Sequence, residues 1–76
     1  MDNATRKNLR IVLEREVKSH PYVKDEEGFR RAMQAVDKTL SGGRTCALDS
    51  IWVKAWKEIG CKGKPTYKAI HALSEN

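Results

Sequence analysis

The sequence predicts an all-α fold, a small bundle of three to four helices that forms a single domain over residues 1–76. Three observations lead to this prediction. A chain of 76 residues has room for one domain. Its apolar residues recur at intervals of three and four in four segments, as they do on the buried face of a helix. Turn-forming residues separate these segments at 19–22, 41–43 and 60–65.

The first helix is expected from Thr5 to Lys18. Asp2, Asn3 or Thr5 is the expected N-cap, and Pro21 ends the element because it disfavours a helical conformation at the residue before it. The face expected to be buried carries Leu9, Val12, Leu13 and Val17. Leu9, Ile11 and Leu13 also alternate, which leaves a short strand as the alternative, but the Arg, Lys and Glu content favours a helix.

The second helix is expected from Glu26 to Leu40. Asp25 is its expected N-cap, and the two glutamates that follow place negative charge at the positive end of the helix. The apolar stripe consists of Phe29, Ala32, Met33, Val36 and Leu40. Gly42 and Gly43 provide the left-handed residue at which helices commonly stop.

The third helix is expected from Cys46 to Ile59, with Thr45 or Asp49 as its cap and Gly60 as its stop. Its stripe is the most regular in the chain: Leu48, Ile51, Trp52, Ala55, Trp56 and Ile59. The fourth helix is expected from Pro65 to Ser74, because proline is favoured at the first helical position. Trp52 and Trp56 lie four residues apart on one face and are expected to anchor the core.

Several functional classes are disfavoured. A core this small rarely leaves room for a catalytic cleft. The chain has no Walker-type phosphate loop and no paired carboxylates in an apolar setting, and neither His20 nor His71 has a nucleophile beside it. We therefore expect a protein that is not an enzyme and that needs no cofactor.

The two cysteines, Cys46 and Cys61, are expected to be reduced thiols packed as small apolar side chains. A zinc site built from them with His20 and His71 is the alternative, but the close ligand spacing typical of such sites is absent, so no metal is expected. No apolar run reaches the roughly 18 residues of a membrane span, and no signal peptide is evident. The sequence predicts a cytoplasmic protein with no membrane partner.

The net charge is +5 and the isoelectric point is about 9.5. A basic surplus attracts polyanions, among which nucleic acid is the leading candidate. The alternative is that this charge only keeps a small protein soluble.

A more specific signal lies where the third helix meets the fourth. The third helix ends at Gly60, which has Ile59 and Cys61 as apolar neighbours, and Ile70 and Leu73 would seat the fourth helix on the core. In these features residues 55–73, about a quarter of the chain, resemble the helix-turn-helix of DNA-binding domains.

Two features depart from the usual motif. The turn is about one residue longer, and Trp56 stands where a small residue is usual. The resemblance implies that the fourth helix enters the major groove of DNA, as in a transcription regulator that binds its site as a dimer. DNA is favoured over RNA.

The expected phosphate contacts come first from Lys62 and Lys64, which flank Gly63 at the start of the fourth helix. Between Ile59 and Ser74 there is no Asp or Glu. The alternative is a solvated, lysine-rich turn, with Tyr67 in the core. The complete set of candidate nucleic-acid-binding residues is Lys62, Lys64, Thr66, Tyr67, Lys68 and His71, together with Arg6, Lys7 and Arg10 near the N-terminus. The N-terminal group would extend the phosphate-contacting surface if the first helix packs beside the fourth.

A protein-binding inhibitor or adaptor that acts on a larger protein is the second hypothesis. Compact basic domains without enzymatic motifs, including proteins encoded by mobile elements, suit such a role. Ile11 and Val53 lie off the apolar stripes of their helices. If both were exposed and neighbouring, they would mark a protein or oligomer interface.

Overall fold

The computed structural model describes residues 3–44 and 49–73, which form four helices and no strand. These are α1 (Asn3–Lys18), α2 (Glu26–Leu40), α3 (Asp49–Glu58) and α4 (Tyr67–Ala72). The all-α prediction is confirmed. The alternative of a strand around residues 9–13 is wrong, because this segment lies in the middle of α1.

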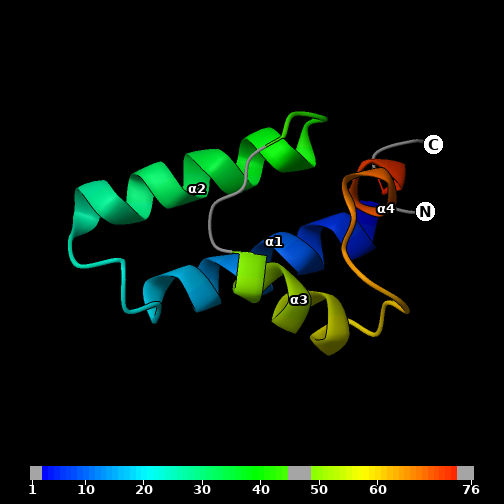
Figure 1. Ribbon diagram of the computed structural model, residues 1–76, viewed down its shortest axis with the longest axis horizontal. Coiled ribbons are helices and arrows are strands. Elements are labelled where there is room, and N and C mark those ends of the chain that lie inside the picture. Colours follow the sequence, from blue (N-terminus) through cyan, green and yellow to red (C-terminus); the bar gives the residue numbers. More distant parts are fainter. Residues whose placement is uncertain (1–2, 45–48, 74–76) are drawn as a thin grey trace.

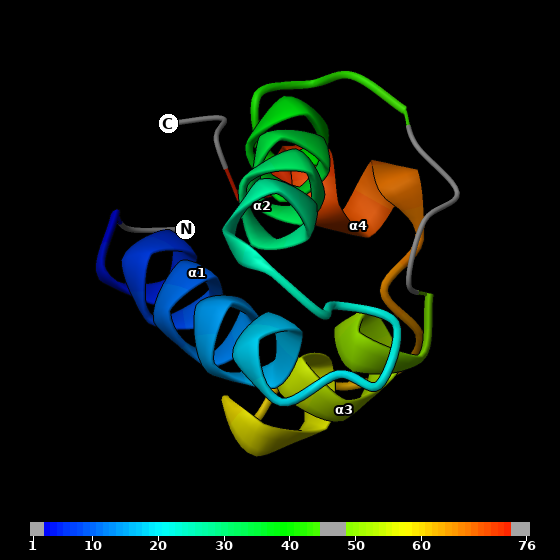
Figure 2. The same ribbon diagram turned by 90° about the vertical axis from the view of Figure 1, so that its left-hand side faces the viewer.

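The helices surround one core (Figures 1 and 2). α1 and α2 run in opposite directions and are joined by the turn at residues 19–25. α3 packs against α1, and α4 packs against α2. The molecule measures 35 × 22 × 20 Å, and α4 lies with the start of α1 and the end of α2 at one end of its long axis.

Most residues of the predicted helical stripes are buried in the core. Val12, Phe29, Ala32 and Ile59 are only partly buried, and Leu48 lies outside the described residues. Leu9, Leu13 and Val17 of α1 are completely buried, and so is Ala55 of α3. The remaining buried apolar side chains are Met33, Val36, Leu40, Ile51, Trp52, Trp56, Ile70 and Leu73. Both tryptophans are therefore core anchors, as predicted. Burial of large side chains on four short helices is the main favourable contribution to the stability of the fold.

Two helix starts differ from the prediction. α1 begins at Asn3, so Thr5 lies inside the helix and does not cap it; Asp2 lies outside the described residues. α4 begins at Tyr67, so Pro65 is not its first residue. Thr66 has an extended conformation (φ −73°, ψ 160°), and its side chain accepts a hydrogen bond from the amide of Ala69. Threonine is therefore the N-cap, and proline precedes it.

The predicted start of α2 is confirmed. The Asp25 carboxylate caps the helix by accepting a hydrogen bond from the Gly28 amide at 2.8 Å. α3 begins at Asp49. Its predicted first residues, 46–48, and the predicted cap Thr45 lie outside the described part of the chain, as does Ser74 at the predicted end of α4.

Both predicted glycine stops are confirmed. Gly42 follows α2 with a φ of 107°, and Gly60 follows α3 with a φ of 86°. After α3, the amide of Gly60 donates to the Lys57 carbonyl at 3.0 Å and that of Cys61 to the Trp56 carbonyl at 3.1 Å. This pair of bonds is a Schellman motif, which satisfies carbonyls that the helix leaves open.

Candidate nucleic-acid interface

The two groups of basic residues expected to bind nucleic acid lie at the same end of the molecule. The first half of α1 meets the end of α2, where Nη2 of Arg6 donates to the Leu40 carbonyl at 3.2 Å. α4 meets the same end of α2, where Nε2 of His71 lies 3.1 Å from the Gly43 carbonyl oxygen. We call the part of the molecule formed by residues 3–10, 38–44 and 59–73 the cationic end.

Two of the predicted arginines bind other parts of the protein. Arg6 is half-buried, and its hydrogen bond to Leu40 places positive charge at the negative end of α2. Arg10 makes two hydrogen bonds to the Asp37 carboxylate, at 2.8 and 3.2 Å, and this contact raises the pKa of its guanidinium. Both arginines join α1 to α2. Lys7 between them is exposed and makes no ion pair with a described residue.

The turn between α3 and α4 presents its lysines to solvent. Lys62 and Lys64 are exposed, and neither has an ion-pair partner in the described ranges 3–44 and 49–73. The indole Nε1 of the buried Trp56 donates to the Lys62 carbonyl at 3.2 Å. Gly63 has a φ of 80°, a left-handed conformation that favours glycine. The backbone of the turn is thus attached to α3, while its lysine side chains face outward.

On α4, the predicted residues divide by their contacts. Thr66 caps the helix through its hydroxyl. Tyr67 and His71 are half-buried, with ring centroids 6.1 Å apart. Because a carbonyl oxygen only accepts, His71 donates to Gly43 through Nε2. Lys68 is exposed. Among the candidate residues of α4, it is therefore the one whose charge is open to solvent.

Arg44 is a member of this end that the sequence analysis did not identify. It is exposed, and its guanidinium carbon lies 5.4 Å from the centroid of the Tyr67 ring, within the range of a cation–π contact. Arg44 follows the glycine pair after α2, and it reaches α4 only because α4 packs against α2. No local pattern in the sequence signals this contact.

Basic and acidic residues are divided unequally along the sequence. The three segments of the cationic end contain eight Lys and Arg residues and no Asp or Glu. Four carboxylates lie within two residues of the segments in the sequence, namely Asp2, Asp37, Glu58 and Glu75, and Asp37 binds Arg10. The rest of the chain contains seven Lys and Arg residues and all ten Asp and Glu. The net charge of +5 therefore comes entirely from the cationic end.

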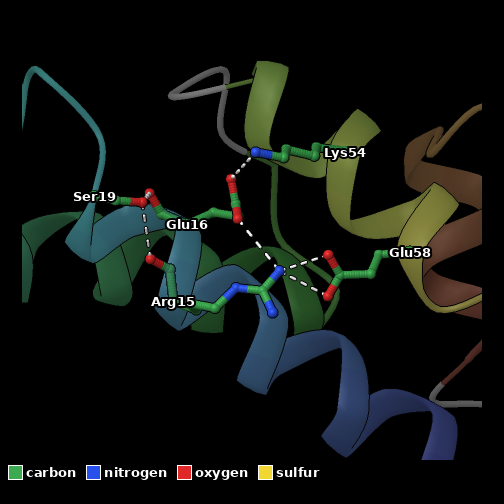
Figure 3. A network of polar contacts seen from close by, with 5 residues as sticks. All are labelled: Arg15, Glu16, Ser19, Lys54 and Glu58. Atoms are coloured by element: carbon green, nitrogen blue, oxygen red, sulfur yellow. Dashed lines mark hydrogen bonds and ion pairs between the residues drawn. The ribbon is translucent and has the colours of Figure 1, made fainter.

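Outside the cationic end, several basic side chains are neutralised by carboxylates (Figure 3). Nη2 of Arg15 lies 2.5 and 2.7 Å from the two carboxylate oxygens of Glu58. Nζ of Lys54 lies 3.1 Å from Oε1 of Glu16, and this contact, together with Arg15, lowers the pKa of Glu16. These contacts link α1 to α3.

The geometry between α3 and α4 differs from that of a compact helix-turn-helix. Residues 59–66 connect the two helices, whereas the motif usually has a turn of three to four residues. α3 packs against α1 and α4 against α2. The helix-turn-helix resemblance therefore rests on the sequence pattern, and α4 is positioned by α2.

The structure also bears on the predictions about the cysteines, metal binding and membrane spans. Cys61 is a free thiol packed against the core, and burial raises its pKa, as expected for a reduced structural cysteine; Cys46 lies outside the described residues. No group of three or more potential metal ligands occurs in the described chain. None of the described helices is both long and apolar enough to cross a bilayer.

The large apolar side chains exposed in the described chain are Ile11 at 62%, Val53 at 50% and Tyr22 at 82%. Tyr22 was not singled out from the sequence as a candidate contact residue. It belongs to the turn between α1 and α2, and its ring centroid is 5.3 Å from that of His20. This turn lies at the far end of the long axis from α4 (Figure 1).

Comparison of the chain with protein-family models, with curated proteins and with solved structures finds no match. The proposals below therefore depend on the residues and their geometry.

Proposed function

We propose that this protein binds nucleic acid through the cationic end, with DNA as the favoured ligand. The observation that supports the proposal is the separation of charge: eight basic residues and no carboxylate in three segments, which the fold brings to one end. Phosphate contacts by Lys and Arg, and the release of the counterions they replace, supply most of the affinity in non-specific nucleic-acid binding. A dimer remains a prediction, and a regulatory role that depends on a specific site would require base contacts in addition to these phosphate contacts.

A binding surface for phosphates requires positive charge gathered in one part of the molecule. If +5 served solubility alone, basic and acidic residues would be interspersed over the surface. Instead, the exposed Lys7, Lys62 and Lys68 lie in segments that contain no Asp or Glu, and they form no ion pair with a described residue. Exposed lysines without carboxylate partners are available to phosphate oxygens.

The test is fluorescence anisotropy with a labelled DNA duplex over a salt series. We expect a Kd of roughly 10⁻⁴ to 10⁻⁶ M near physiological salt and a log–log salt slope of about −3 or steeper. The double variant Lys62→Ala/Lys64→Ala should bind all sequences more weakly and should have a slope smaller by about 2.

A matched control distinguishes local contact from total charge. Lys24 and Arg30 are exposed, lie outside the cationic end and have no carboxylate partner among the described residues. Lys24→Ala/Arg30→Ala removes the same charge and should leave the slope nearly unchanged. Equal effects from the two double variants, or unchanged affinity in Lys62→Ala/Lys64→Ala, would contradict the assignment of the turn.

A protein-binding inhibitor or adaptor is the second candidate, favoured by the exposure of Ile11 and Val53 on two helices that pack together. Under this second candidate, the cationic end has no part in binding the partner. Absence of DNA binding at low salt would remove the first proposal, and Ile11→Lys and Val53→Lys would then be tested for loss of binding to the captured protein.

A further inference from the structure

Within the proposed function, the structure also bears on how nucleic acid is held. Sequence readout in the major groove uses side chains that present paired donors and acceptors to base edges, commonly Arg, Asn or Gln. α4 is six residues long, with Ile70 buried and Tyr67 and His71 half-buried against the end of α2. Lys68 and Ala72 are the residues it exposes. One lysine and one alanine provide little means of distinguishing base pairs.

The outward cations are mostly lysines. Lys62 and Lys64 stand on the turn, Lys68 on α4 and Lys7 on α1. The lysine ammonium is a compact point charge on a flexible stem, unlike the planar fork of arginine. Of the two exposed arginines of this end, Arg44 lies over the Tyr67 ring and Arg10 is bound to the Asp37 carboxylate. Such a set suits phosphate oxygens, whose positions are nearly the same in every sequence.

The cationic end also offers few groups that could bind the unpaired bases of a single strand. Proteins that hold single strands stack bases on exposed aromatic rings. At the cationic end Tyr67 is half-buried beside the Arg44 guanidinium, and Trp56 of the adjoining α3 is buried. Tyr22 is exposed, but it belongs to the turn between α1 and α2, which lies at the opposite end of the molecule (Figure 1).

The size of the molecule sets how many phosphates a bound nucleic acid can present to it. The two shorter dimensions of the molecule are 22 and 20 Å. Duplex DNA carries one charge per 1.7 Å of its axis, so a length of this size presents about 12 phosphates, roughly half of them on the facing side. A single strand of the same length presents fewer phosphates, and the Tyr67 and His71 rings of this end are half-buried, which limits stacking of its bases.

We infer that the cationic end binds the phosphate backbone of double-stranded nucleic acid without reading its sequence. This inference rests on the proposed function and narrows its ligand to a duplex. DNA and RNA duplexes share this backbone chemistry, and the experiment separates them.

The experiment measures anisotropy of the full chain with four labelled 20-base-pair DNA duplexes of unrelated sequence, an RNA duplex and a single strand of equal length. We expect the four DNA affinities to agree within about threefold and the single strand to bind about tenfold more weakly. The RNA result identifies which duplex is preferred, and tight binding of either one supports the inference.

A variant gives an independent measurement. Lys68→Ala should weaken binding to all four DNA duplexes by the same factor, about three- to fivefold. A duplex bound more than tenfold tighter than the others, or a loss confined to one sequence in Lys68→Ala, would show base readout and overturn the inference. A single strand bound as tightly as the duplexes would overturn it through stacking. In either case the proposed function stands, whereas absence of all binding at low salt overturns both.

Discussion

At Asp25, one carboxylate closes the start of α2. Its Oδ1 accepts the Gly28 amide at 2.8 Å, satisfying one of the four amides that a helix leaves without partners at its start. Asp25→Ala should lower the free energy of unfolding by about 1 kcal/mol, measured by urea denaturation. Asp25→Ser keeps an acceptor at this position and should cost much less. Equal losses in the two variants would mean that the carboxylate acts through its charge alone.

Gly60 closes the end of α3 by a different route. Its φ of 86° lies in the left-handed region, and a Cβ added there would meet no atom within 4 Å. Gly60→Ala should therefore destabilise the protein by about 1 kcal/mol through backbone strain and not through a clash. Gly60→Asn should cost less, because asparagine tolerates this conformation. If Gly60→Ala unfolded at the same temperature as the wild type, residue 60 would not need the left-handed conformation, and this explanation of the glycine would be wrong.

At the scale of the helices, the sequence predicts most where the signals are local. The bounds of α2 match the prediction because Asp25 and the glycine pair lie beside the residues they cap. The start of α4 was misplaced by two residues. Pro65 and Thr66 both favour a helix start, and the hydrogen bond from the Ala69 amide to the Thr66 side chain selects the threonine.

In the candidate site, too, the sequence predicts the local features and not the contacts between distant segments. Lys62, Lys64 and Lys68 are visible in the sequence as a run of cations without carboxylates. The contacts of Arg6 with Leu40 and of Arg10 with Asp37 join residues 34 and 27 positions apart, so they depend on how α1 packs against α2. Arg44 reaches Tyr67 in the same way, through the packing of α4 on α2.

The link between α1 and α3 should depend on pH through Glu16. Lys54 and Arg15 lower the pKa of this carboxyl in the folded protein below its ordinary value of 4.5. A lowered folded pKa means that the stabilisation is fully present above the unfolded pKa and is lost as the pH falls through the folded one. The Tm should therefore decline between about pH 5 and pH 3.

The variant Glu16→Gln isolates this contribution. It should lower the Tm at pH 6 and make the decline on acidification shallower, so that the two proteins converge at low pH. Glu14→Gln removes the same charge from α1 without altering the network in Figure 3, and it should keep the wild-type decline. Parallel Tm profiles for wild type and Glu16→Gln would exclude Glu16 as the source.

At the scale of the whole molecule, stability and binding are connected through charge. A domain of 76 residues has a free energy of unfolding of only about 4–11 kcal/mol. Eight cations gathered at one end repel one another in the folded state, whereas the unfolded chain spreads them apart. A polyanion that bridges the three segments of the cationic end relieves this repulsion, and it does so most effectively when the fold holds them together.

Duplex DNA should therefore raise the Tm. A ligand that binds the folded state alone adds about 2.7 kcal/mol at 100 times its Kd, which corresponds to about 10–20 °C for a domain of this size. The rise should disappear in high salt and be much smaller for Lys62→Ala/Lys64→Ala/Lys68→Ala, whose Tm without DNA should equal or exceed that of the wild type because repulsion is reduced. An unchanged or lower Tm at saturating DNA would mean that the unfolded chain binds as tightly. Affinity would then follow from the number of lysines in the chain and not from their arrangement by the fold.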